Sequence, residues 1–129
     1  MPLTVADYDA DGDLDLFSAS KHGNSLLVNR GGSYAPIDPE SVGLPRESIT
    51  ANWVDYDNDG LPDLQIVPQG IFRQRTDHSF EHTGLFALNP EQYVAAICNW
   101  FDRDNDGRQD LLMLLPAMYY LRLRLLREE

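Results

Sequence analysis

Hydrophobic and polar positions alternate in short runs along most of this chain. Between residues 46 and 88, the strand-length segments ITANWVD, LQIVPQ, IFRQRTD and SFEHTGL are separated by punctuation rich in Gly, Pro and Asp. β-branched and aromatic residues are frequent in these segments, and no long stretch places its apolar residues at helical spacing. These features favour short antiparallel strands over helices. The pattern predicts four strands in this unit.

The same order of segments recurs along the chain. Three acidic loops begin at Asp7, Asp55 and Asp102, which lie 48 and 47 residues apart. Units of four short strands with a period in the forties are typical of propeller blades. The prediction is an all-β partial β-propeller of four-stranded antiparallel blades, with a little under three repeats of about 47 residues in one repeat domain. The expected blades are residues 1–45, 46–88 and 89–129, the last incomplete.

The last segment, YYLRLRLLREE, has two interpretations. Leu121, Leu123 and Leu125 alternate with Arg122 and Arg124, as in a half-exposed strand. A segment rich in Leu and Arg also suits a helix, so a helical tail stays open.

The chain is too short to close a propeller alone, because a closed ring takes about four to eight blades. Either it is part of a longer repeat protein, or several copies associate and cover each other's blade faces and edges. The expected partners are therefore further blades of a longer chain, another protein, or other copies in a homo-oligomer.

The three loops share the pattern D-x-D-x-D-G-x-x-D. Calcium takes about six to eight oxygen ligands, and carboxylates at alternate positions of a tight loop can converge on one centre. By analogy with other calcium loops, position seven supplies its main-chain carbonyl. Calcium, about three ions per chain, is the predicted cofactor. The predicted ligands are Asp7, Asp9, Asp11, Asp13 and Asp15, then Asp55, Asp57, Asp59, Leu61 and Asp63, and finally Asp102, Asp104, Asp106, Arg108 and Asp110.

Other interpretations of the loops are weaker. A helix-loop-helix calcium site needs a glutamate at position twelve, where this chain has Ser18, Ile66 and Met113. An isolated Asp-Gly pair predicts only a hairpin turn, but clustered aspartates repel one another unless a cation neutralises them. Oxygen ligands also disfavour zinc and copper, and magnesium usually keeps several waters.

The charge of the chain points to the same partner. The formal net charge is −11, and 13 of the 21 acidic side chains lie in the three loops. Such a chain is not expected to bind nucleic acid or an anionic membrane. Membrane insertion is not expected either, and the N-terminus lacks the features of a signal peptide. The single cysteine, Cys98, excludes an internal disulfide and a multi-cysteine zinc site.

Three runs carry a family resemblance: DYDADGDLDL at residues 7–16, WVDYDNDGLPDL at 53–64 and WFDRDNDGRQDL at 100–111. They resemble the FG-GAP repeats, also described as VCBS-type repeats, of integrin-α-like β-propellers. The resemblance implies a seven-bladed propeller, calcium in the loop between the first and second strands of a blade, and an extracellular or cell-surface location. One departure is Thr76-Asp77-His78, where these repeats usually have a glycine turn.

The leading functional prediction is a non-catalytic, calcium-binding module that acts as an extracellular adhesion or protein-interaction scaffold. Trp53, Tyr56, Trp100 and Phe101 flank the loops and motivate a carbohydrate-binding alternative, although such rings more often belong to the core. An enzyme is not expected, because the metal pattern uses most of the aspartates and the three histidines are scattered.

Overall fold

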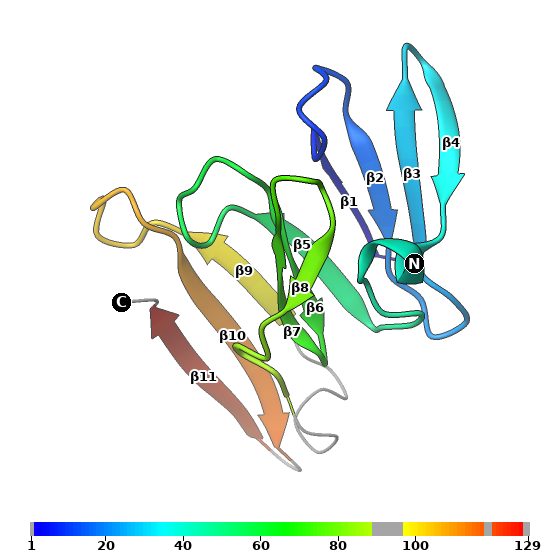
Figure 1. Cartoon of the computed structure of the whole chain (residues 1–129). Coiled ribbons are helices and arrows are strands. Elements are labelled where there is room, and N and C mark those ends of the chain that lie inside the picture. The colour runs from blue at the N-terminus through cyan, green and yellow to red at the C-terminus, as the bar shows by residue number, and fades with distance from the viewer. Residues whose placement is uncertain (1, 89–96, 118–119, 128–129) are drawn as a thin grey trace.

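The computed structural model describes residues 2–88, 97–117 and 120–127. Its strands form three antiparallel sheets in which strands that follow one another in sequence are neighbours. The sheets lie side by side like blades of an incomplete propeller, which confirms the predicted fold class (Figure 1). The first sheet contains β1 (Leu3–Ala6), β2 (Asp15–Ser18), β3 (Ser25–Arg30) and β4 (Ser33–Ile37); the second contains β5 (Thr50–Val54), β6 (Asp63–Val67), β7 (Gly70–Gln74) and β8 (Phe80–His82); the third contains β9 (Ile97–Phe101), β10 (Asp110–Ala117) and β11 (Tyr120–Arg127).

Burial alternates along a strand where one face of its sheet is open and is continuous where both faces are covered. In β2, Asp15 and Phe17 are buried while Leu16 and Ser18 are half-buried. All residues of β6 are buried, because the second sheet lies between the other two. Strand β8 is shorter than the predicted segment 79–85, and residues 93–96 of the predicted strand before the third loop lie outside the described residues.

The hairpin between β7 and β8 closes without glycine. His78 adopts a left-handed conformation with φ of 67°. The main-chain N–H of Arg75 donates to the carbonyl of Ser79 at 2.7 Å, and the N–H of His78 donates to the carbonyl of Arg75 at 2.9 Å. His78 therefore takes the conformation that glycine usually takes in such turns.

The C-terminal segment is a strand. β11 pairs antiparallel with β10 from Asp110 opposite Arg127 to Ala117 opposite Tyr120. The two-residue alternation therefore predicted the tail correctly, and the helical alternative is wrong. Residues 119, 128 and 129 of this segment lie outside the described residues.

The hydrophobic core lies between successive sheets. We call the side of a sheet that faces the preceding sheet its leading face, and the other side its trailing face. Phe17, Ala19, Leu26 and Val28 on the trailing face of the first sheet pack against the leading face of the second. The leading face of the second sheet contributes Ala51, Leu64, Ile66, Phe72 and Phe80.

A short connection holds the first two sheets together. It contains the 3-10 helix η1 (Pro39–Val42), which is capped by Asp38 and ends at Gly43 with φ of 90°. A Cβ atom at Gly43 would collide with the main-chain carbonyl oxygen of Phe80 on β8. Glycine is thus required both by conformation and by the close approach of the second sheet. No helix in the described part of the chain has the length and apolar character needed to cross a membrane.

Candidate metal centres

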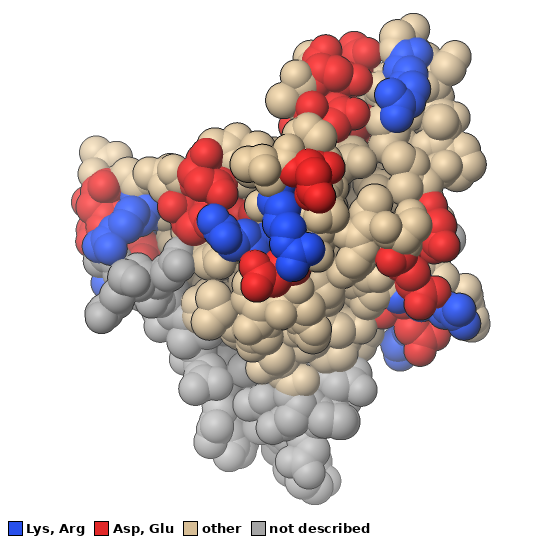
Figure 2. Space-filling model, viewed as in Figure 1, with Lys and Arg blue, Asp and Glu red and all other residues tan. Residues whose placement is uncertain are grey.

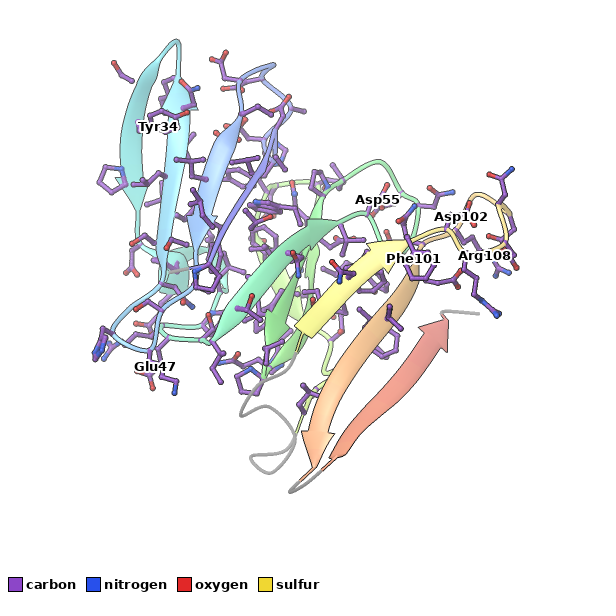
Figure 3. All side chains as sticks on the ribbon, turned by 180° about the vertical axis from the view of Figure 1, so that it is seen from behind. Tyr34, Glu47, Asp55, Phe101, Asp102 and Arg108 are labelled. Carbon is purple, nitrogen blue, oxygen red and sulfur yellow. The ribbon has the colours of Figure 1, made fainter. Side chains whose placement is uncertain are left out.

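Each acidic loop joins the first and second strands of its sheet. The loops follow β1, β5 and β9, and all three lie at the corresponding end of their sheets (Figure 1). Asp55 and Asp102 begin two of these loops and project from the ends of neighbouring sheets (Figure 3). In the space-filling view, acidic side chains gather in separate groups at this edge of the molecule, with basic side chains beside some of them (Figure 2).

The first aspartate of each loop holds the turn together. One carboxylate oxygen of Asp7 accepts the N–H of Asp11 at 3.1 Å, and the other accepts the N–H of Gly12 at 2.9 Å. Asp55 makes the same pair of bonds at 3.1 and 2.8 Å, and Asp102 makes them at 3.0 and 2.7 Å. This recurrence shows that position one folds the loop as well as bringing a carboxylate to it.

The backbone of the loop bends at the same two positions in each copy. At position four, Ala10, Asn58 and Asn105 have φ values of 61°, 62° and 59°. At position six, the glycine has φ values of 93°, 88° and 87° in the three loops. Asparagine and glycine tolerate this left-handed conformation better than other residues, and Ala10 is the exception.

The aspartate at position five of the loop also supports the turn. Asp11, Asp59 and Asp106 each accept the N–H of the residue two positions later at 2.9 Å. Such local bonds between a side chain and the backbone are typical of aspartate in turns.

The aspartate at position nine is the buried anchor of each loop. Asp15, Asp63 and Asp110 are all 0% exposed. Asp63 accepts the N–H of Tyr56 at 3.3 Å and the N–H of Gln74, on β7, at 2.7 Å. Asp15 accepts the corresponding N–H groups of Tyr8 and Asn29 at 3.0 and 2.9 Å, and Asp110 accepts the N–H of Arg103 at 3.1 Å. In the first two sheets this carboxylate therefore ties the loop to the third strand.

The aspartate at position three of the loop has a buried carboxylate oxygen in the first two loops. One carboxylate oxygen of Asp9 and one of Asp57 are buried without a hydrogen-bond partner among the residues that the structure describes. A buried carboxylate oxygen is costly unless a donor or a cation faces it. This position therefore fits a metal ligand better than it fits a turn former.

The structure brings most of the predicted side-chain ligands together. In each cluster, one oxygen from every member lies within 4.8 Å of those of the others. Asp11, Asp13 and Asp106 are outside the clusters found among the described residues, and the Asp13 carboxylate instead accepts the N–H of Gly31 at 2.9 Å. The main-chain carbonyls of Asp13, Leu61 and Arg108 stay predicted ligands. The clusters are Asp7, Asp9 and Asp15; Asp55, Asp57, Asp59 and Asp63; and Asp102, Asp104 and Asp110.

Burial and neighbouring negative charges raise the pKa values of two aspartates in the loops. Burial raises the pKa of Asp63 to about 7, with a further contribution from the charges of Asp57 and Asp59. Burial also raises the pKa of Asp9, together with the charges of Asp15 and Asp11. Carboxylates that are held close together out of water resist ionisation, and a divalent cation would relieve this repulsion.

Basic side chains distinguish the three clusters. Nε of Arg73, on β7, lies 2.7 Å from the Asp57 carboxylate, and the Asp59 carboxylate lies 3.7 Å from the same guanidinium. Burial acts to raise the pKa of Asp57, but hydrogen bonds to Arg73, Asp59 and Asp55 and the charge of Arg73 together outweigh it, and the pKa falls below its usual value. In the third loop, Arg108 pairs with Asp106 at 3.1 Å and Arg103 lies 3.9 Å from Asp110. The loop pattern could not reveal Arg73, because its place depends on the pairing of β6 with β7.

The aromatic rings beside the loops belong mainly to the interfaces between sheets. Tyr8 stacks on Trp53 with ring centroids 5.8 Å apart, and Tyr56 is buried. Trp100 packs against the second sheet. Among the four rings considered for sugar stacking, Phe101 alone is exposed, so these rings belong mainly to the core, as the sequence favoured.

Comparisons with known proteins support the family predicted from the sequence. The family described as FG-GAP-like repeat matches residues 7–65, which include the first two acidic loops. No curated protein and no solved structure gives a significant match. The third loop repeats the same geometry outside the matched range. Residues 7–65 of this chain are therefore similar to an FG-GAP-like repeat.

Proposed function

We propose that the chain is a calcium-binding β-propeller repeat module of the FG-GAP/VCBS type. The observation that carries the proposal is the threefold recurrence of one carboxylate cluster in one loop geometry. Turn formation accounts for the aspartates at positions one and five. It does not account for the aspartate at position three, whose buried oxygen in the first two loops has no hydrogen-bond partner in the described structure.

Calcium is the cation that suits these ligands best. Each cluster offers carboxylate oxygens and no sulfur or nitrogen donors. Calcium accepts several such oxygens in a flexible arrangement, whereas magnesium demands a smaller octahedral cage and dehydrates reluctantly. In the second loop, Asp55, Asp57, Asp59 and Asp63 would hold the ion, and the backbone bonds to Asp55 and Asp63 keep two of these carboxylates in place beforehand.

The biological role that we propose is a non-catalytic scaffold for adhesion or protein interaction outside the cell. The FG-GAP-like match supports a repeat module of this kind. Calcium sites of extracellular modules have Kd values of about 10⁻⁴ to 10⁻³ M, weaker than those of intracellular sensors. Bound ions would stiffen the loops at one edge of the sheets and leave the other surfaces for recognition.

Calorimetric titration of chelator-treated protein with calcium tests the metal-binding proposal. We expect saturable binding, and weaker binding of magnesium under the same conditions. A variant carrying Asp9→Asn, Asp57→Asn and Asp104→Asn should lose most of the calcium signal. Glu47→Gln removes a charge at an exposed position outside the loops and should bind as the unaltered chain does (Figure 3). Absence of binding by the folded, unaltered chain would reject the proposal.

A further inference from the structure

Position two of each acidic loop connects the loop to its buried anchor. This residue follows the first aspartate directly, and its main-chain N–H donates to the carboxylate at position nine. The backbone at position two therefore helps to fix the anchor of the site. The bonds run from Tyr8 to Asp15 at 3.0 Å, from Tyr56 to Asp63 at 3.3 Å and from Arg103 to Asp110 at 3.1 Å.

In the first loop, the side chain at position two packs on the next sheet. Tyr8 is 5% exposed. Its ring stacks on Trp53 of β5 and on Phe80 of β8, with centroid distances of 5.8 and 6.1 Å. The ring of His78, in the hairpin between β7 and β8, meets it in a T-shaped arrangement with centroids 6.1 Å apart. Three rings of the second sheet therefore hold the side chain of Tyr8.

The second loop repeats this arrangement, and the third loop does not. Tyr56 is 7% exposed and lies in a cluster with Ile71 of its own sheet and Trp100 of the third. The third loop has Arg103 in the same place, with 45% of its side chain exposed and its Nε 3.9 Å from the Asp110 carboxylate. The third loop therefore keeps the backbone bond to its anchor but has no ring at position two.

The packing of Tyr8 on the second sheet restrains the ligands of the first site. Tyr8 lies between Asp7 and Asp9 in sequence, and its N–H donates to Asp15. All three carboxylates of the first cluster are thus connected to Tyr8 by the chain or by a hydrogen bond. Residues that hold metal ligands from outside the coordination sphere typically change metal affinity by about 10–100-fold. A ring anchored in another sheet can therefore affect the affinity of the site.

We propose that Tyr8 and Tyr56 are positioning residues, through which the calcium affinity of a loop depends on the packing of its sheet against the following sheet. The inference rests on the calcium sites of the proposed function. The stacked ring fixes the backbone of the loop before the ion arrives, so less ordering accompanies binding. Because coupling is reciprocal, an ion in the first loop also strengthens the contact between the first two sheets.

Trp53→Leu tests this coupling from outside the first loop. A one-site chain that carries Asp57→Asn and Asp104→Asn keeps only the first site, whose Kd for calcium is measured by calorimetric titration. Adding Trp53→Leu removes a ring that stacks on Tyr8 and should raise this Kd at least about fivefold. Circular dichroism shows that each chain is folded.

Two controls separate this effect from a general loosening of the core. Ile66→Ala removes side-chain volume from the same core cluster, and should lower the stability to urea without changing the Kd of the one-site chain. A chain that keeps only the third site, through Asp9→Asn and Asp57→Asn, should have the same Kd with and without Trp53→Leu, since its position two is Arg103. An equal rise in Kd in either control would overturn the inference.

Substitutions at Tyr8 give a second route to the same answer. In the one-site chain, Tyr8→Leu removes the ring and keeps the backbone N–H, so calcium binding should weaken at least about fivefold. Tyr8→Phe keeps the ring and should restore the affinity. An unchanged Kd in a folded Trp53→Leu or Tyr8→Leu chain would overturn the inference and leave the proposed calcium function intact. A one-site chain that binds no calcium would overturn the proposed function of the first loop, and the inference with it.

Discussion

At the residue scale, the four repeated aspartates of a loop have different structural roles. Asp7 and Asp11 hold the backbone of the turn, and Asp15 anchors the loop to the sheet. Asp9 adds negative charge and a buried oxygen without a hydrogen-bond partner in the described structure. The sequence pattern predicted these residues as a set, because their spacing is regular. It could not separate their roles, because the backbone bonds depend on the folded loop.

Substitutions in the first loop should separate these roles. Asp9→Asn should weaken calcium binding there by at least about tenfold, because it removes a charged ligand. Metal-free stability should not fall, since the substitution relieves repulsion from Asp15. Asp7→Ala should weaken binding and also lower the metal-free free energy of unfolding by about 1 kcal/mol, because the N–H groups of Asp11 and Gly12 lose their acceptor.

The measurements are calcium titration and urea unfolding in chelator, with Glu47→Gln as the charge control. A loss of metal-free stability in Asp9→Asn as large as that in Asp7→Ala would contradict the assignment, because both aspartates would then be turn formers.

Arg73 should act as a competitor of calcium at the second loop. Its guanidinium lies against Asp57 and Asp59, so an incoming ion must displace it or share these carboxylates. Arg73→Ala is expected to tighten binding at this loop a few-fold, a modest effect because the ion pair is exposed to solvent. Arg75→Ala, two residues along the chain, provides a matched control. Unchanged or weaker binding in Arg73→Ala would show that Arg73 does not oppose the ion.

At the element scale, the strands were predictable because short segments rich in apolar, β-branched and aromatic residues lie between Gly, Pro and Asp, and some alternate with the period of a strand. The tail also follows this rule, and pairing of Asp110–Ala117 with Tyr120–Arg127 selects the strand over the helix. The length of β8 was overestimated, because regular pairing ends after His82, where the N–H of Ile71 donates to the carbonyl of Leu85 at 2.9 Å. The role of Gly43 was not predictable, since it depends on contact between two sheets.

Gly43→Ala should be strongly destabilising. The backbone of the alanine would adopt a disfavoured left-handed conformation, and its methyl group would collide with the carbonyl oxygen of Phe80. We expect the free energy of unfolding to fall by about 2–4 kcal/mol, measured by urea denaturation. Gly32→Ala, with φ of 99° but open space around its Cβ, should cost only about 1 kcal/mol. Equal losses in the two variants would mean that the approach of Phe80 contributes nothing.

At the scale of the whole molecule, electrostatic repulsion opposes folding. The formal net charge of −11 is concentrated in the loops, and three bound calcium ions would reduce it to −5. The period of the loops predicted where this charge lies.

Calcium should therefore raise the melting temperature of the chain. A site filled at one hundred times its Kd adds about 2.7 kcal/mol of stability. Circular dichroism melting with calcium, compared with sodium chloride of equal ionic strength, separates specific binding from charge screening. Equal melting temperatures in the two salts would show that the ions do not bind preferentially to the folded chain.

The most direct test of the central claim is to count bound calcium ions by native mass spectrometry. The unaltered chain should saturate at three ions, and Asp9→Asn, Asp57→Asn and Asp104→Asn should each lose one. The three variants together should retain none at the same calcium concentration. An unaltered chain that takes up no specific calcium, or variants that keep the same number of ions as the unaltered chain, would contradict the assignment of the three loops as calcium sites.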